Sequence, residues 1–226
     1  MKTRIFTVLF IVSIFLLPSA LAANSQGLTW GVQENQEIQY NLRVSMSVES
    51  TITTMTINEL EQVKYKIMVL PDIPDTITSI SQIPYVTGTM TYLNDSSITP
   101  PPMSVPVSNL IMPIGNWALI DQLMKESAEY SPLNLTWIDN FSNWGYSYKM
   151  EITYPIEAEM TLTVQFSKAD GAASLISVSY DYDTLGSGEV SFTRIGGPLD
   201  TTTILLIVGG IGAVLIVGVV FWKLRR

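Results

Sequence analysis

"AEMTLTVQFSKADGAASLISVSYDYD", residues 158–183, contains two runs of alternating apolar and polar residues separated by a short segment with a glycine. Alternation with a period of two is typical of a β-strand with one solvated face. In both runs the apolar residues occupy even positions. If the two strands pair with their apolar side chains on the same face, even positions lie opposite even positions, and the loop between the strands then has an odd number of residues. We therefore predict a hairpin with the three-residue loop Ala169-Asp170-Gly171, in which the glycine is left-handed.

The same alternation extends along the C-terminal half of the chain. Even-numbered apolar residues run from Trp144 to Tyr154 before the hairpin and return at Val190 and Phe192 after it. Four or more such segments joined by short turns form an antiparallel meander.

The N-terminal part of the mature chain has a second long alternation. Every even position between Glu37 and Glu49 is apolar, which predicts one strand. The pattern slips at Thr53-Thr54 and resumes on odd positions. We interpret the slip as a bulge and the polar segment "NELEQ", residues 58–62, as a hairpin turn. A further strand is predicted over residues 86–92, ending in the turn "NDSS".

One helix is predicted in "GNWALIDQLMKES", residues 115–127, where Asn116 is the expected N-cap. Its apolar residues fall on one face: Trp117, Ile120, Leu123 and Met124. The expected fold class is mainly β, an antiparallel sheet meander or sandwich with one packed helix, plus one C-terminal transmembrane helix.

The first 22 residues have the organisation of a secretory signal peptide. Lys2 and Arg4 precede an apolar run over residues 5–17, and Ala20 and Ala22 form an A-x-A processing site. The run is shorter than the roughly 20 residues that a membrane-spanning helix needs, which argues against an uncleaved N-terminal anchor. We therefore expect an exported protein.

The C-terminal end is predicted to anchor the chain in the cell membrane, with the ectodomain outside. Residues 204–222 are apolar or glycine throughout, and Lys223, Arg225 and Arg226 follow at once. A buried core helix is the alternative. The expected organisation is a signal peptide (1–22), an extracellular β-rich domain (23–195), a juxtamembrane linker (196–203), one transmembrane helix (204–222) and a cytoplasmic tail (223–226).

The charge of the chain limits its partners. All 20 Asp and Glu residues lie between residues 23 and 200, where there are seven Lys and Arg residues, so this part carries a net charge of −13. Nucleic acid is excluded as a partner on this basis, whereas cations and basic surfaces are favoured. We expect the membrane and an unknown extracellular protein or glycan as partners. The small-xxx-small pair Gly209 and Ala213 would allow a homodimer through the span.

The composition also excludes most catalytic sites. The chain has no Cys and no His, which removes Ser/His/Asp triads, cysteine nucleophiles and His-ligated metals. Phosphate-binding and dinucleotide-binding glycine motifs are missing from the sequence as well. Carboxylates remain, as in glycosidases. We expect a protein that is not an enzyme and needs no cofactor other than, at most, calcium.

The predicted hairpin and the turn after it, "TLGSG", bring acidic residues together. Glu159 faces Asp181 and Glu157 faces Asp183 across the hairpin, and the next turn sets Asp183 opposite Glu189. Like charges directly opposite each other destabilise a sheet by up to about 1 kcal/mol per pair. A calcium ion, which takes oxygen ligands, is the candidate that would relieve this repulsion. The alternative is a solvated acidic face that discourages strand association.

Three acceptor sequons for N-glycosylation occur in the expected ectodomain, at Asn94, Asn134 and Asn140. Asn94 lies in a predicted turn, and Asn134 lies on the face opposite Leu133, Leu135 and Trp137. We expect a glycoprotein with at least one of these sequons occupied.

Two stretches resemble archaeal surface proteins of the choice-of-anchor kind, known from Asgard-type archaea. "WGVQENQEIQYNL" is similar to their Trp-Gly-Val start followed by a strand, although Asn35-Gln36 stand where Gly-Asp is usual. "FSKADGAASLISVSY" is similar to their recurring hairpin with a glycine before an apolar strand. The order of signal peptide, β-rich ectodomain and C-terminal anchor is also alike. The resemblance implies an uncharacterised surface ectodomain and identifies no catalytic residues.

These observations predict a membrane-anchored surface ectodomain that acts as a non-enzymatic binding or envelope-structural module. One alternative is a carboxylate-dependent extracellular hydrolase, which needs two carboxyls in an aromatic cleft. The other is a carrier of an apolar ligand or lipid, in which a sheet curled around the helix would line a cavity with Met and aromatic side chains.

Overall fold

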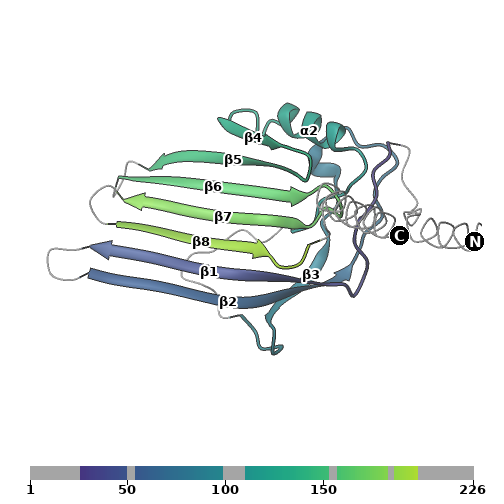
Figure 1. Cartoon of the computed structure of the whole chain (residues 1–226). Coiled ribbons are helices and arrows are strands. Elements are labelled where there is room, and N and C mark those ends of the chain that lie inside the picture. The colour runs from purple at the N-terminus through teal and green to yellow at the C-terminus, as the bar shows by residue number, and fades with distance from the viewer. Residues whose placement is uncertain (1–25, 50–53, 99–109, 153–156, 183–185, 198–226) are drawn as a thin grey trace, which may run out of the picture.

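The structure, a computed structural model, describes residues 26–49, 54–98, 110–152, 157–182 and 186–197 (Figure 1). These residues form one antiparallel sheet of eight strands, so the prediction of a mainly β fold is confirmed. Within the described ranges the strands belong to a single sheet, and the sandwich arrangement is not formed. α2 is the one α-helix among the same residues.

The elements follow the chain in this order: β1 (Glu37–Glu49), β2 (Thr54–Val69), the 3₁₀ helix η1 (Ile80–Gln82), β3 (Thr87–Tyr92), α2 (Trp117–Glu126), β4 (Leu135–Asp139), β5 (Asn143–Ile152), β6 (Ala158–Ser167), β7 (Ala173–Tyr182) and β8 (Gly186–Arg194). The order across the sheet is β3-β2-β1-β8-β7-β6-β5-β4. Strands β4 to β8 therefore form the predicted meander, and β1 adds beside β8.

The predicted hairpin turn at residues 58–62 is wrong, because β2 continues straight through this segment. β1 pairs with β2 along its whole length, from Glu37 with Lys66 to Glu49 with Thr54, so the connection lies at residues 50–53, outside the described ranges. Facing residues of the two strands have opposite parity, which explains the slip in the alternation without a bulge. The polar segment is tolerated because this part of β2 lies at the edge of the sheet.

The predicted strand over residues 86–92 and the turn at residues 94–97 are confirmed. β3 ends at Tyr92, whose N–H donates to the Ser96 carbonyl oxygen at 3.0 Å. Asp95 adopts a positive φ of 65° in the turn, and its carboxylate lies 2.7 Å from the ammonium of Lys64 on β2. This ion pair lowers the pKa of Asp95 and raises that of Lys64. The turn is thus held against the adjacent strand.

The predicted helix is confirmed as α2. The side chain of Asn116 accepts a hydrogen bond from the Leu119 N–H at 3.1 Å, which is the expected N-cap. Ile120, Leu123 and Met124 are buried. Because so short a helix is marginal alone, its stability depends on packing this face against the rest of the domain.

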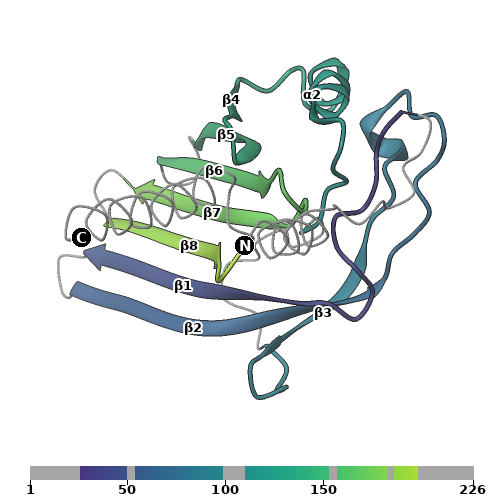
Figure 2. The same cartoon turned by 45° about the vertical axis from the view of Figure 1, so that its right-hand side comes forward.

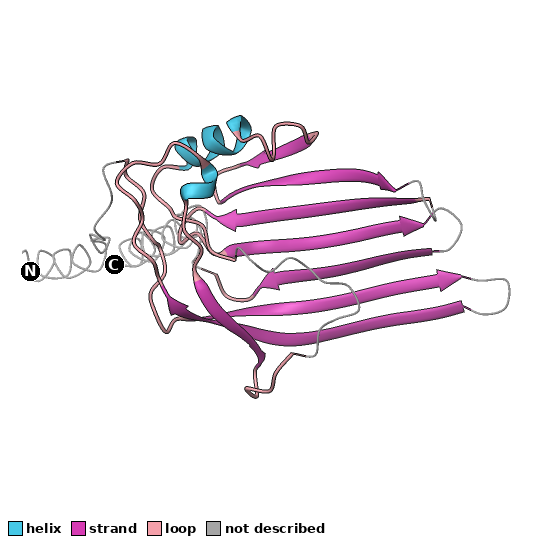
Figure 3. Ribbon diagram, turned by 180° about the vertical axis from the view of Figure 1, so that it is seen from behind, coloured by secondary structure: helices cyan, strands magenta, loops and turns pink. Residues whose placement is uncertain are grey.

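Among the residues that the structure describes, the covering layer lies over one end of the sheet. Figures 1 and 3 show α2, η1 and the connecting loops gathered at the end where β1 begins and β8 ends, while the strands continue well beyond them. Figure 2 shows α2 near the β4 edge, and η1 is in contact with α2. The described covering elements therefore shelter one half of the apolar face.

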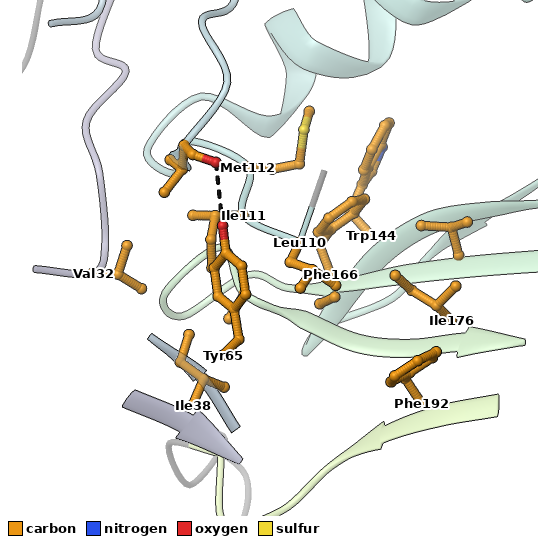
Figure 4. Close-up of a cluster of buried hydrophobic side chains, with 14 of the residues drawn as sticks. Val32, Ile38, Tyr65, Leu110, Ile111, Met112, Trp144, Phe166, Ile176 and Phe192 are labelled. Atoms are coloured by element: carbon orange, nitrogen blue, oxygen red, sulfur yellow. Dashed lines mark hydrogen bonds between the residues drawn. The ribbon is translucent and has the colours of Figure 1, made fainter. Parts of the chain in front are cut away.

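The core lies between this half of the sheet and the covering segments. Ile38, Phe166, Ile176 and Phe192 are buried sheet residues, and Figure 4 shows them facing Leu110, Ile111 and Met112 from the segment before α2. The hydroxyl of Tyr65 points into the same group and donates to the Val86 carbonyl oxygen at 3.2 Å (Figure 4). Apolar residues further along the same strands, such as Met46, Met160 and Tyr180, are only partly buried.

A buried ion pair fastens the β6–β7 loop to the end of β8. The guanidinium of Arg194 donates to both carboxylate oxygens of Asp170, at 2.8 and 2.6 Å. The hydroxyl of Tyr40 is buried nearby without a hydrogen-bond partner among the described residues. Burial raises the pKa of Tyr40. The positive charge of Arg194 opposes this effect, and the negative charge of Asp170 adds to it.

The predicted signal peptide, transmembrane helix, cytoplasmic tail and the pair Gly209 and Ala213 lie outside the described ranges. The part of the chain that the structure describes contains no helix long and apolar enough to cross a membrane.

Candidate functional site

The predicted pairing across the β6–β7 hairpin is confirmed, with Glu159 directly opposite Asp181. The loop differs from the prediction, because it has four residues, Lys168 to Gly171, closed by the Ser167 N–H donating to the Ala172 carbonyl oxygen at 2.9 Å. A register shift between Gln165 and Phe166 absorbs the extra residue. Gly171 has the expected left-handed conformation, with φ 76°.

The predicted pairing of Asp183 with Glu189 is wrong. It requires Tyr182 opposite Val190, whereas Tyr182 pairs with Gly186, and Glu189 faces Ser179. The connection between β7 and β8 is therefore shorter than expected, because the glycine-rich segment before Glu189 is part of the strand. Asp183 itself lies outside the described residues, and Glu157 is exposed just before β6.

Three of the predicted cluster residues still lie around one shallow hollow on the polar face. Glu159, Asp181 and Glu189 line a cavity of about 370 Å³ together with serine and threonine residues from β1, β6, β7 and β8. Glu159 already has a cationic partner, since the ammonium of Lys149 lies 2.5 Å from its carboxylate. Within the described ranges, no group of three or more acidic side chains is arranged to share one metal ion. Calcium binding stays a prediction.

The three sequon asparagines are all exposed. The side-chain oxygen of Asn94 accepts hydrogen bonds from the N–H and hydroxyl of Ser96, at 3.0 and 2.6 Å. The side-chain oxygen of Asn140 accepts from the Ser142 N–H at 3.0 Å. Asn134 precedes β4. Glycosylation of these exposed positions stays a prediction.

An aromatic cavity of about 300 Å³ lies on the apolar face, between the sheet and the α2 region. The sheet contributes six residues to its lining: Trp144, Tyr146, Leu162, Val164, Phe166 and Ile176. The covering segments contribute the other four: Met112, Met124, Glu129 and Tyr130. Figure 4 shows Trp144, Phe166 and Ile176 on the same side of the sheet as Met112.

Closely packed aromatic rings support one wall of this cavity. Trp144 is 1% exposed and packs between the rings of Trp117 and Phe166, with centroids 5.7 and 6.4 Å away. Trp137 lies 6.1 Å from Trp144, and the ammonium of Lys125 lies 5.2 Å from the Trp137 ring centroid. Contacts of this kind stabilise ring positions beyond simple burial. The wall is therefore preformed.

The polar groups of the cavity gather at Tyr146, Tyr130 and Glu129. The Tyr130 and Tyr146 rings are 6.0 Å apart between centroids. Burial raises the pKa of Tyr146, and the neighbouring Tyr130 phenol and Glu129 carboxylate raise it further. Both phenols are neutral at physiological pH and can donate or accept a hydrogen bond. The site can hold an apolar group and orient one polar group of a ligand.

The sequence predicted the components of this cavity but not the cavity. The even-numbered aromatic and aliphatic residues of β5, β6 and β7 were expected on one apolar face, and Met124 on the apolar face of the helix. The position of the helix over this face depends on the connections before and after it, for which alternation contains no signal. Tyr130 and Glu129 lie in a turn outside any periodic pattern.

Comparison with known protein families, with curated proteins and with solved structures finds no match for this chain.

Proposed function

We propose that this protein is a membrane-anchored surface module that binds a small, largely apolar ligand and is not an enzyme. The observation that carries the proposal is the aromatic cavity between the sheet and α2. Its volume of about 300 Å³ lies at the lower end of the range typical of small-molecule sites. A ligand with an aromatic or branched aliphatic body and one hydroxyl, carbonyl or amide group matches the lining.

The surface location rests on the sequence at the two ends of the chain. The charged start, apolar run and processing site of residues 1–22 support export, and the uncharged residues 204–222 with their basic flank support an anchor. The same layout underlies the resemblance to archaeal surface proteins.

The hydrolase alternative has less support at this cavity. A glycosidase mechanism needs two carboxyl groups, roughly 5 to 9.5 Å apart across the substrate bond. Glu129 is the one carboxylate among the described residues that line the cavity. Binding is therefore favoured over hydrolysis.

Native mass spectrometry of the full-length protein, extracted from membranes in detergent, tests the proposal. We expect a bound small molecule on the wild-type chain. Leu162→Trp places a larger side chain in the cavity and should abolish this adduct while the domain remains folded. Thr161→Trp is the matched control, because Thr161 is the neighbour of Leu162 on the opposite face of β6.

The result is decisive in either direction. Loss of the adduct in Leu162→Trp but not in Thr161→Trp supports the cavity as the site. An adduct that persists in Leu162→Trp, or a wild-type protein without one, contradicts the proposal.

A further inference from the structure

In the part of the chain that the structure describes, the first part of β2, before Val63, forms a free edge of the sheet. β2 extends over Thr54–Val69, whereas β3 pairs only with its last part, from Val63 to Val69. Among the described residues, no strand lies beside the outer edge of β2 from Met55 to Gln62, and Figures 1 and 3 show this part of β2 as the outermost strand. Its outward-pointing backbone N–H and carbonyl groups are a template for another strand.

This edge is well formed, because β1 supports it from the other side. The register between β1 and β2 is continuous from Glu49 with Thr54 to Arg43 with Leu60 and beyond. The edge contains no proline and extends over eight residues, Met55 to Gln62. Leu60 and Met55 are 66% and 54% exposed. Short length and proline, two common protections of natural edges, are therefore missing here.

On this edge the usual distribution of side chains is reversed: acidic side chains point to the apolar face of the sheet, and an apolar side chain points to the polar face. Glu59 and Glu61 lie opposite Val44 and Leu42, so they point to the apolar face, while Leu60 lies opposite Arg43 on the polar face. Both glutamates are exposed, and neither has an ion-pair partner among the described residues. Inward-pointing charge of this kind discourages indiscriminate strand pairing. A partner with complementary charge would remove this barrier.

The complementary sequence follows from the geometry of paired strands. Residues directly opposite each other share a face. A strand added beside β2 therefore needs basic residues opposite Glu59 and Glu61, with an apolar residue between them opposite Leu60. The pattern is basic–apolar–basic in either strand direction.

A hollow at the end of the free edge would receive the end of such a strand. Where β3 stops, a cavity of about 530 Å³ is lined by β2 residues on one side and by the turn after β3 on the other: Leu60, Glu61, Gln62, Tyr92, Leu93, Asn94 and Ser96. Leu93 is 41% exposed in this turn. The turn blocks further extension along the edge, so it limits the register of an added strand.

We propose that the β2 edge binds an extended basic–apolar–basic segment of another protein by strand addition. A second copy of this chain fits less well. In a two-fold arrangement with Leu60 opposite its own copy, Glu59 and Glu61 lie opposite each other twice, and such like-charged pairs are destabilising. The edge is separated from the strands of the aromatic cavity by β1 and β8, so this proposal is independent of ligand binding there.

The test uses full-length protein in lipid nanodiscs and fluorescein-labelled peptides at about 50 mM salt, where charge interactions are weakly screened. By fluorescence anisotropy, the peptide TTKVKTT should bind about tenfold more tightly than TTEVETT. The double variant Glu59→Lys/Glu61→Lys should reverse this preference. The matched control Asp72→Lys/Glu151→Lys has the same change in net charge and should keep it, because both residues are exposed and lie away from this edge.

A backbone control separates strand addition from charge attraction alone. N-methylation of the valine and the following lysine of TTKVKTT removes two successive N–H donors, one of which faces β2 in either register. The methylated peptide should lose binding. Equal binding of the methylated peptide overturns the proposal, as does a reversal of preference in the control variant. A wild-type dimer through this edge that TTKVKTT fails to dissociate also overturns it.

Discussion

The buried hydroxyl of Tyr40 has an energetic cost in the folded protein. It is fully buried and has no hydrogen-bond partner among the described residues, although Asp170 and Arg194 are close. An unsatisfied buried polar group costs about 1–3 kcal/mol. Tyr40→Phe keeps the ring, so we expect the free energy of unfolding in denaturant to rise by about 1 kcal/mol.

Tyr65→Phe is the matched control, because the Tyr65 hydroxyl donates to a buried carbonyl oxygen. Its removal should therefore destabilise the domain.

The pH dependence of stability provides a second measurement of the Tyr40 hydroxyl. The pKa of Tyr40 is raised from 10.0, so above that pH the unfolded chain releases a proton that the folded chain retains, and stability falls as pH rises. Tyr40→Phe should weaken this alkaline loss. A destabilised Tyr40→Phe would show that the hydroxyl binds a buried water instead.

The β6–β7 hairpin depends on a glycine for two separate reasons. Gly171 has φ 76°, and a Cβ atom there would lie 1.8 Å from the Met112 carbonyl oxygen. Gly27 has a similar φ of 80° but nothing within 4 Å of such a Cβ. Left-handed backbone costs a non-glycine residue about 1–2 kcal/mol. We therefore expect Gly171→Ala to lower the free energy of unfolding at least twice as much as Gly27→Ala, and equal losses would refute the steric contribution.

Alternation of side chains predicted elements well wherever a strand has one buried face. β1 was expected over the residues that it occupies, and the cap and apolar face of α2 were both readable from Asn116 and the residues after it. The prediction failed at Asn58 to Gln62, where both faces of an edge strand are exposed and polarity no longer signals a turn. It failed again at Gly186 and Gly188, since a glycine shows no preference for either face of a strand.

The arrangement of the elements in the whole molecule was harder to predict from the sequence than the elements themselves. A meander was expected from successive alternating segments, but nothing in Glu37–Glu49 or in Gly186–Arg194 indicates that these two strands are neighbours. The cavity also depends on this arrangement of elements, because it exists only where α2 and the Met112 segment cover part of the apolar face. Such contacts join residues distant in sequence, and local patterns contain little information about them.

At the scale of the whole molecule, β8 should be required for a continuous sheet, because it pairs with both β1 and β7. A chain that ends after Tyr182 lacks β8, which separates β1 and β7, and so exposes an edge on each. We expect this truncated chain to be rapidly degraded in limited proteolysis. A chain that ends after Gly197 retains all eight strands and should resist the protease for much longer. Equal resistance of the two chains would show that the sheet forms without its last strand.

The position of β1 beside β8 also affects how the protein is made. Every residue pair between these strands joins segments about 150 residues apart, so the fold has many contacts of high sequence separation. During synthesis, β1 would leave the ribosome long before β8 and would have only β2 to pair with. We therefore expect the nascent chain to stay incompletely folded and dependent on chaperones until β8 has been synthesised, with pairing of β1 and β8 as a late, slow step.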